Sequence, residues 1–261
     1  MSSTGLEGAR YEQLIAAAAT APFEGWDFSW LRGRLVGEKS SWDYLSRARE
    51  LISHAQHVVD VDTGGGEVLA SLNPPSGSVA TESWPPNVSV ARRHLEPLNV
   101  SVVAAQSGAP LPLPDESADV LLNRHGSLVA AEVARILVSG GRLLTQQVGS
   151  QEGLEINAAL GVALPREARG WTLAVATNQL EAAGLKVVDA REQYLEQRVL
   201  DIGALVFHLR AIEWQVPEFT VERFDAELRE IDRIIRREGA FLFHAHRFLI
   251  EARRPRPPLH P

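Results

Sequence analysis

The chain has 261 residues, of which 45% are hydrophobic and 23% are charged, a composition typical of a folded globular protein. It contains no cysteine, which excludes disulfides, thiolate nucleophiles and the common structural zinc sites. Its formal net charge of -7 argues against general binding to nucleic acid, because phosphate contacts need clustered Lys and Arg. No apolar run reaches the roughly 20 residues that cross a bilayer, and no signal-like segment begins the sequence. We therefore expect a cytoplasmic protein that does not enter a membrane.

The first 56 residues are predicted to form a helical extension, or cap, ahead of the main domain. Residues 11–18 carry apolar side chains at helical spacing, and the pattern breaks at residues 21–25. An aromatic cluster around Trp26 follows, and a second helix is predicted at about 41–53.

From residue 57 onward, apolar strand-like runs alternate with helical patterns, which is typical of a parallel α/β sheet. Strands are predicted at 57–62, 78–82, 100–104, 118–123, 141–148, 185–189 and about 244–252. Helices are predicted at 67–72, 87–95, 128–137 and 172–183, the third ending at the glycine stop Ser139-Gly140-Gly141. Residues 57–252 are expected to form one α/β domain with a helical insertion at about 199–235, followed by a flexible tail at 253–261.

The most informative stretch joins the first of these strands to the first helix. The apolar run Val58-Val59-Asp60-Val61 continues through Asp62 and Thr63 into Gly64-Gly65-Gly66 and a helix. Glycines let a backbone turn tightly against a ligand, and free N–H groups at a helix start attract negative groups. Glu82 ends the next apolar run, at about the spacing at which a βαβ unit presents a carboxylate to a ribose. Together these features predict an adenosine-containing ligand.

In order and spacing, these signals resemble the class I S-adenosylmethionine-dependent methyltransferases, in particular those with a Leu-Pro-hydrophobic-Pro-Asp turn before the fourth strand. Here that turn is Leu111-Pro112-Leu113-Pro114-Asp115, and the strand after it ends in Asn123-Arg124-His125. The resemblance covers residues 57–148 well and 172–190 more loosely. It implies a Rossmann-like α/β fold: a seven-stranded, mostly parallel sheet with an antiparallel last strand, carrying N-terminal and C-terminal helical additions. The cofactor would lie across the carboxyl ends of the first strands.

The resemblance also implies which residues hold S-adenosylmethionine. Asp60 matches the acidic residue that ends the first strand, and Gly64 and Gly66 match glycines of the cofactor turn. Glu82 resembles the carboxylate that binds the ribose, whose two hydroxyls suit a planar pair of acceptors. Further cofactor contacts are expected from Asp62, Thr63, Ser83, Gln106, Ser107, Asn123 and Arg124.

Two positions depart from the family pattern. Asp62 stands where the first glycine is usual, so a Cβ and a charge lie where the backbone approaches the methionine part of the cofactor, unless the side chain points away. The run 104–108 lacks the aspartate that commonly meets the adenine amino group. Gln106 or Ser107 could accept that hydrogen bond with less electrostatic gain, which predicts weaker binding.

Methyl transfer from a sulfonium is a direct displacement, which needs a positioned acceptor and excluded water but no covalent residue. His125 is the candidate general base for a hydroxyl acceptor, because it follows the fourth strand and histidine has the best-matched pKa; a surface or capping histidine is the alternative. His244 and His246 share one face of the last strand, and His208 could approach them. Their spacing is not diagnostic of a metal site, so no metal is predicted.

The methyl acceptor is expected to be a small molecule. Aromatic residues at Trp26, Trp30, Trp42 and in the stretch 212–219 could form an apolar lid over it, or could only fix the added helices to the core.

Three other functions stay open. A nicotinamide dehydrogenase shares the glycine-rich turn, but Leu69 stands where its third small residue is required. An RNA methyltransferase shares the fold and is opposed by the acidic charge. A catalytically inactive cofactor-binding or interaction protein would keep the fold while the changes at Asp62 and Gln106 remove activity.

Overall fold

The computed structural model describes residues 3–106, 108–163 and 169–257, which form an eight-stranded sheet flanked by helices. The strands are β1 (Leu35–Gly37), β2 (Val58–Val61), β3 (Val79–Glu82), β4 (Ser101–Ala104), β5 (Ala118–Arg124), β6 (Leu137–Val148), β7 (Lys186–Val199) and β8 (Phe241–Arg253). The helices are α1 (Ser3–Thr20), α2 (Tyr44–Ile52), α3 (Glu67–Ser71), α4 (Pro85–Leu95), α5 (Ala130–Ile136), α6 (Leu154–Ala159), α7 (Leu173–Ala182), α8 (Ile202–Ala211) and α9 (Asp225–Glu238). Two 3-10 turns, η1 (Ser29–Leu31) and η2 (Glu96–Leu98), complete the regular structure of the described residues.

The strand order is β1-β7-β8-β6-β5-β2-β3-β4. Strands β4, β3, β2, β5 and β6 are parallel to one another, whereas β8 pairs antiparallel with both β6 and β7. The chain leaves β2 to one side for β3 and β4 and returns to its other side for β5, so the strand order reverses at β2. The carboxyl ends of β2 and β5 therefore border the crevice in which α/β sheets of this kind bind ligands.

The expected Rossmann-like architecture is confirmed, but the count of seven strands is wrong for the described residues. The additional strand is β1, which pairs antiparallel with β7 at the sheet edge. Its three residues, Leu35-Val36-Gly37, are too few to show an alternating pattern in the sequence. The ion pair between Arg34 and Asp201, with a nitrogen–oxygen distance of 2.5 Å, ties the start of β1 to the start of α8.

Apolar side chains cover both faces of the parallel strands. Val58 and Leu122 pack under α2, α3 and α4, whereas the adjacent residues Val59 and Leu121 pack under α5 and α7. Because both faces are buried, these strands read as continuous apolar runs in the sequence, which is why their positions could be predicted.

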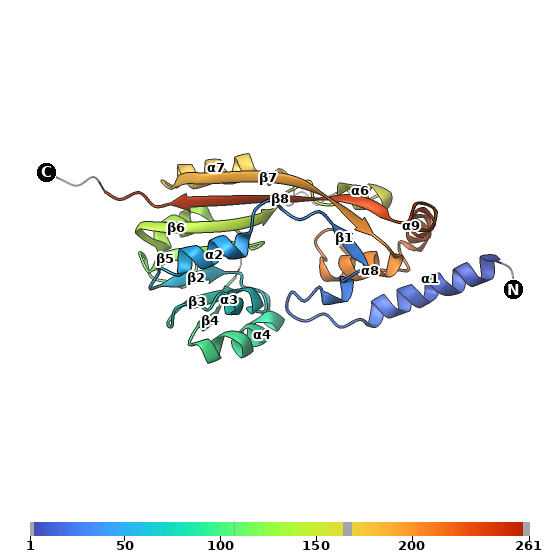
Figure 1. The fold of residues 1–261 in the computed structure, drawn as a ribbon, viewed down its shortest axis with the longest axis horizontal. Helices are drawn as coiled ribbons and strands as arrows, with labels where there is room; N and C mark the ends of the chain where they lie inside the picture. The colour runs from blue at the N-terminus through green and yellow to red at the C-terminus, as the bar shows by residue number, and fades with distance from the viewer. Residues whose placement is uncertain (1–2, 107, 164–168, 258–261) are drawn as a thin grey trace.

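A separate apolar cluster joins the N-terminal helix to the inserted helices. β7 and β8 are the longest strands and run from the main sheet toward α6, α8 and α9 (Figure 1). Helix α8 is buried on nearly all sides, and Tyr11, Ile15 and Ala18 of α1 pack in the same cluster. A helix that is buried on nearly all sides, as α8 is, can be stable only inside such packing.

Several element boundaries differ from the prediction. The helix expected at 128–137 ends at Ile136, and β6 begins at once, so Gly140 is not a helix stop. Gly140 instead has φ +85° within β6 and donates its N–H to Arg254 O at 3.0 Å. β7 continues to Val199 because it pairs along its length with β8, although few of its side chains are buried and they do not alternate by polarity.

Arg254, in the predicted tail, donates to Leu137 O at 2.6 Å and to Glu116 Oε1 at 2.7 Å. The last four residues of that tail, 258–261, lie outside the described residues. None of the helices in the described part of the chain combines the length and the apolar character needed to span a bilayer.

Candidate functional site

The turn between β2 and α3 has the backbone shape that its glycines predict. Gly64 and Gly66 have φ values of +66° and +81°, in the left-handed region that glycine enters without steric cost. A Cβ built on Gly66 would lie 2.8 Å from Cγ of Leu95, so this glycine also lets α4 pack closely on the turn. His94 of α4 adds a polar contact, in which its Nδ1 donates to Gly65 O at 2.7 Å. Glycine is therefore required here by conformation and by packing.

Glu82 lies at the carboxyl end of β3 and faces this turn. Its Oε2 accepts the N–H of Gly64 at 2.6 Å, and its Oε1 accepts the N–H of Trp84 at 2.8 Å. The side chain is 4% exposed, and this burial raises the pKa of Glu82, against the two backbone hydrogen bonds that lower it. Each carboxylate oxygen has two lone pairs, so both retain a position for a further donor.

Asp60 and Thr63 close the base of the turn. Thr63 Oγ1 donates to Asp60 Oδ2 at 2.6 Å, and Thr63 N donates to Thr81 O at 2.9 Å. Burial raises the pKa of Asp60 to about 7, although the Thr63 hydrogen bond lowers it. Asp60 thus has an internal partner and does not point freely into solvent.

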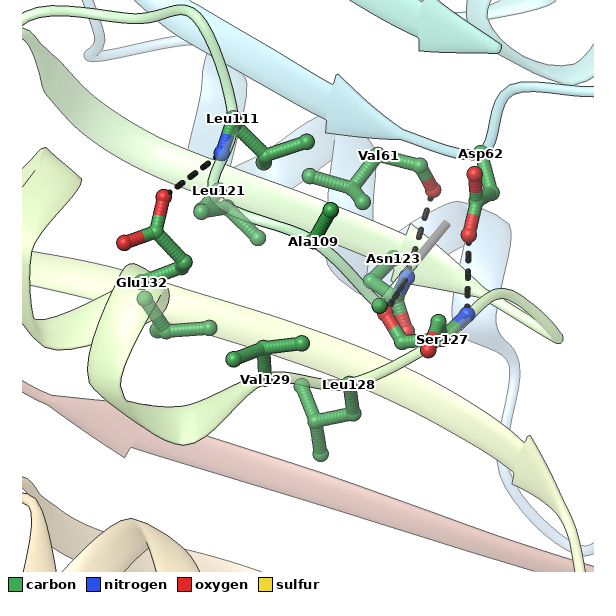
Figure 2. Close-up of a pocket in the computed structure, with 12 residues that line it drawn as sticks. Val61, Asp62, Ala109, Leu111, Leu121, Asn123, Ser127, Leu128, Val129 and Glu132 are labelled. Carbon is green, nitrogen blue, oxygen red and sulfur yellow. Dashed lines mark hydrogen bonds between the residues drawn. The ribbon is translucent and has the colours of Figure 1, made fainter. Parts of the chain in front are cut away.

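Asp62 directs its side chain toward the loop after β5, as Figure 2 shows, where its Oδ2 accepts the N–H of Ser127 at 2.9 Å. Its backbone has φ +54°, a left-handed conformation that Asp tolerates better than most residues. A Cβ built on Gly126 would lie 2.5 Å from the Asp62 Cβ, so Gly126 provides the space that this side chain needs. The carboxylate at the unusual position therefore holds the loop of residues 125–129 and does not extend over the glycines.

Asn123, at the end of β5, is fully buried and uses its whole side chain internally. Its Nδ2 donates to Val61 O at 3.2 Å and to Ser127 O at 3.3 Å. Its Oδ1 accepts from Thr145 Oγ1 at 2.9 Å and from Gln147 Nε2 at 2.5 Å. A ligand could contact this residue only through its backbone.

Beside these strand ends lies a small, partly open pocket with a volume of about 20 Å³, shown in Figure 2. It is lined by residues that include Val61, Leu121 and Leu128. This volume holds one or two water molecules at about 10–15 Å³ each and is far too small for a nucleoside.

The Leu-Pro-Leu-Pro-Asp turn is held in place by α5. Arg135 donates to Leu113 O at 2.6 Å and to Leu111 O at 3.0 Å, and it pairs with Asp115 at 2.8 Å. Glu132 Oε2 accepts the N–H of Leu111 at 2.8 Å. These contacts join residues about twenty positions apart and were not foreseen from the sequence.

Trp26 lies directly on the glycine turn. A Cβ built on Gly64 would be only 2.1 Å from Cδ1 of Trp26, so the indole covers this backbone. The ring centroid lies 6.0 Å from that of Phe28 and 5.8 Å from that of Trp214, and Trp26 remains 41% exposed. The ion pair between Glu24 and Arg93 anchors this segment to α4. We call residues 23–28 the cover segment.

The other two tryptophans of the expected lid have structural partners. The Trp30 ring stacks on Phe207 with 4.8 Å between centroids, and the Arg34 guanidinium lies 3.7 Å from the Trp30 centroid. Trp42 is buried, and its Nε1 donates to Gln146 Oε1 at 2.8 Å. These two rings thus fix the N-terminal segment to the rest of the protein.

His125 follows β5 in a left-handed conformation with φ +64°, and its N–H donates to Gln146 O at 2.7 Å. Because Gln146 Oε1 accepts from Trp42, the Nε2 of Gln146 is the atom that faces His125 Nε2, at 2.9 Å. A neutral His125 therefore accepts at Nε2 and carries its proton on Nδ1. Surrounding protein lowers the pKa of His125 well below its ordinary value, and the charges of Arg124 and Arg247 lower it further.

The remaining predicted cofactor residues lie around the same crevice. Arg124 is exposed at the end of β5, on the sheet face that also carries Asp60 and that packs against Tyr44 of α2. Ser83 is half-buried between Glu82 and Trp84, and Gln106 is exposed on the loop after β4. Ser107 lies outside the described residues.

The three histidines considered as metal ligands each have a different partner. His246 lies 2.9 Å from Glu192, His244 lies 2.7 Å from Glu155, and His208 lies 3.1 Å from Gln215. Within residues 3–106, 108–163 and 169–257, no three His, Asp or Glu side chains are grouped as a metal site requires.

No protein-family model and no curated protein matches the sequence. Solved structures do match the fold. A proposed methyltransferase from Bacillus halodurans C-125 is 19% identical, with 81% of this chain and 97% of that chain covered and a TM-score of 0.59. The YcgJ protein from Bacillus subtilis is 18% identical, with coverages of 82% and 99% and a TM-score of 0.58. The [4+2]-cyclase SpnF is 17% identical, with coverages of 96% and 96% and a TM-score of 0.53. The chain therefore has the α/β fold of the class I methyltransferases.

Proposed function

We propose that this protein is an S-adenosylmethionine-dependent methyltransferase with a small-molecule acceptor. The observation that carries the proposal is the position of Glu82 at the end of β3, hydrogen-bonded to the N–H of Gly64 in the glycine turn after β2. The Glu82 carboxylate, whose two oxygens suit the hydroxyls of a ribose, thus lies beside a glycine turn that a ligand can approach closely. Both are at the point where the strand order reverses.

The residues fit this cofactor on the nucleoside side without rearrangement of the strands. Glu82 keeps acceptor positions for two hydroxyls, and the turn presents the flat glycine backbone that a ligand can approach. Asp62 adds no obstacle, because its carboxylate is directed to Ser127. On the other side, Trp26 lies against Gly64 and has to turn outward, which its 41% exposure allows.

When bound, S-adenosylmethionine would supply an electrophilic methyl group for direct displacement by the acceptor. The residues of this chain then have to bind the cofactor, orient the acceptor toward the methyl group and exclude water. We assign binding to Glu82 and the backbone of residues 62–66, and exclusion of water to Trp26 and Trp214. His125 remains the candidate base. It is exposed after β5, and to take a proton at Nε2 it must release the hydrogen bond from Gln146.

A small acceptor is favoured by what surrounds the crevice. Phe23, Trp26, Phe28 and Trp214 form an apolar cluster beside the glycine turn. The net charge of -7 disfavours RNA, which needs positive charge along its phosphates. We further propose that residues 1–56 and 199–235 act together as the acceptor-side cap of the domain at 57–252, since both contribute to one apolar cluster.

The contact between Trp26 and Gly64 also favours a second function, a catalytically inactive protein in which the cover segment stays on the turn. The two functions can be separated by measuring S-adenosylhomocysteine released from S-adenosylmethionine in the presence of fractionated small molecules or of RNA. Release that depends on a small-molecule fraction supports the proposal, and release that depends on RNA refutes the acceptor class. Tight cofactor binding with no release in any fraction would favour the inactive protein.

A further inference from the structure

Asn87 is an exception to the rule that buried polar groups have hydrogen-bond partners. Its side chain is 1% exposed, and neither Nδ2 nor Oδ1 has a partner. Across the described residues, no other buried side-chain nitrogen or oxygen lacks one. An unpaired amide in a protein interior costs about 1–3 kcal/mol, so an apolar residue at this position would stabilise the ligand-free protein.

The position of Asn87 in the fold places it beside the candidate site. Helix α4 begins three residues after Glu82, and Asn87 lies in its first turn. Ala91 is one helical turn later on the same buried face, and its Cα lies 3.3 Å from a Cβ built on Gly66. Leu95, one turn further, also packs on Gly66. The face that carries Asn87 is therefore the face of α4 that packs on the glycine turn.

A backbone link also connects Asn87 to the Glu82 carboxylate. Trp84 donates its N–H to Glu82 Oε1 at 2.8 Å and accepts the N–H of Asn87 at its carbonyl oxygen, at 2.9 Å. The start of α4 is thus fixed relative to Glu82. The buried face of α4 is apolar at Val90, Ala91 and Leu95 and carries the amide of Asn87 at its N-terminal end.

We propose that Asn87 is a further ligand-binding residue, whose side-chain amide hydrogen-bonds the nucleoside half of the cofactor beside Glu82. This inference rests on the proposed function. A carboxylate such as Glu82 can only accept, whereas an amide offers both a donor and an acceptor. A nucleoside presents both kinds of group, in its ribose hydroxyls and in the adenine edge, which an asparagine matches. The cost of the unpaired amide is then a property of the ligand-free protein that binding removes.

Burial of Asn87 means that part of the protein has to move when a ligand reaches it. The cover segment contacts the glycine turn through Trp26 and α4 through the ion pair of Glu24 with Arg93. Both side chains of this ion pair are well exposed, and such pairs contribute only about 0–1 kcal/mol. This ion pair therefore adds little to hold the cover segment against α4, and the packing of Phe23, Trp26 and Phe28 is the contact that must open when the segment lifts.

The test compares Asn87→Leu with a matched change at a buried asparagine that has a partner. Asn157 serves as the control, because its Nδ2 donates to Gln215 O at 2.9 Å. For the wild type and both variants, the melting temperature is measured, and calorimetry gives the affinities for S-adenosylhomocysteine, adenosine and methionine. Asn87→Ala is measured in parallel, because it removes the amide without adding volume.

We expect Asn87→Leu to melt at the wild-type temperature or above it, and to bind S-adenosylhomocysteine and adenosine about 3- to 10-fold more weakly, with methionine binding unchanged. Asn157→Leu should melt lower and keep the wild-type affinity. Wild-type affinity in both Asn87 variants, or a fall in melting temperature for Asn87→Leu as large as that for Asn157→Leu, would overturn the inference alone. Absence of binding to the wild type would overturn the proposed function and this inference together.

Discussion

Replacement of Gly126 by alanine tests where the Asp62 side chain lies. The added Cβ would be 2.5 Å from the Asp62 Cβ, whereas carbon atoms in contact are normally about 3.5–4.0 Å apart. Gly126 is not among the residues with positive φ, so alanine is acceptable to the backbone and the clash is the main effect. Both Cβ atoms are fixed to the backbone, so the ends of β2 and β5 must separate. Overpacking of this kind costs about 1–3 kcal/mol.

The loss of stability caused by Gly126→Ala should depend on the Asp62 side chain. In an Asp62→Gly background the overlapping Cβ is gone, although Asn123 Nδ2 remains 2.8 Å from the new methyl group. Asp62→Gly alone relieves a left-handed backbone, worth about 1–2 kcal/mol, and loses the hydrogen bond from Ser127 N, worth a similar amount. We therefore expect the single change to be nearly neutral and Gly126→Ala to be at least about 1 kcal/mol less destabilising in its presence.

Urea denaturation of the wild type, the two single variants and the double variant gives this coupling energy directly. Additivity within about 0.5 kcal/mol would show that the two side chains do not meet. It would refute the placement of Asp62 toward the loop after β5.

Three further predictions concern the crevice. Glu82→Gln should weaken binding of S-adenosylhomocysteine about 10- to 100-fold, because charge-assisted hydrogen bonds are worth about 1.5–3 kcal/mol. The control Glu96→Gln changes an exposed carboxylate and should leave the affinity unchanged. Equal calorimetric affinities for the two variants would contradict the role of Glu82. Trp26→Ala should raise the association rate of S-adenosylhomocysteine measured by stopped flow, since the indole lies on Gly64, and an unchanged rate would show that Trp26 does not restrict entry. For Asp60, burial raises the pKa to about 7, so the folded protein holds a proton that the unfolded chain releases above about pH 4. The stability that Asp60 contributes is therefore lost as the pH rises from about 4 to about 7. Asp60→Asn should flatten the fall in unfolding free energy between about pH 4 and about pH 7, and an unchanged slope in urea denaturation would contradict the shifted pKa.

The sequence predicted the part of the fold in which local pattern and tertiary environment agree. Strands β2 and β5 are buried on both faces and appear as apolar runs, and the glycine turn has a backbone that few other residues adopt. The long β7 was missed beyond residue 189, because its second half is stabilised by pairing with β8 and has no apolar alternation. Strand β1 was missed because three residues carry no period.

The same distinction applies to the candidate site. Glu82 could be predicted from its distance along the chain to the turn, since a βαβ unit fixes that geometry. The contact of Trp26 with Gly64 could not, because it joins the cover segment to the turn across 38 positions that no local pattern relates. The unpaired amide of Asn87 is also invisible in the sequence, where an asparagine in the first turn of a helix is ordinary.

The most direct test of the proposed cofactor is calorimetric titration of the wild-type protein with S-adenosylmethionine, S-adenosylhomocysteine and NAD. We expect saturable one-to-one binding of the first two compounds and none of NAD. Absence of binding by a protein that still melts cooperatively would contradict the proposed function. The cover segment over Gly64 would then be the permanent state of the turn, in a chain that keeps the methyltransferase fold without its cofactor.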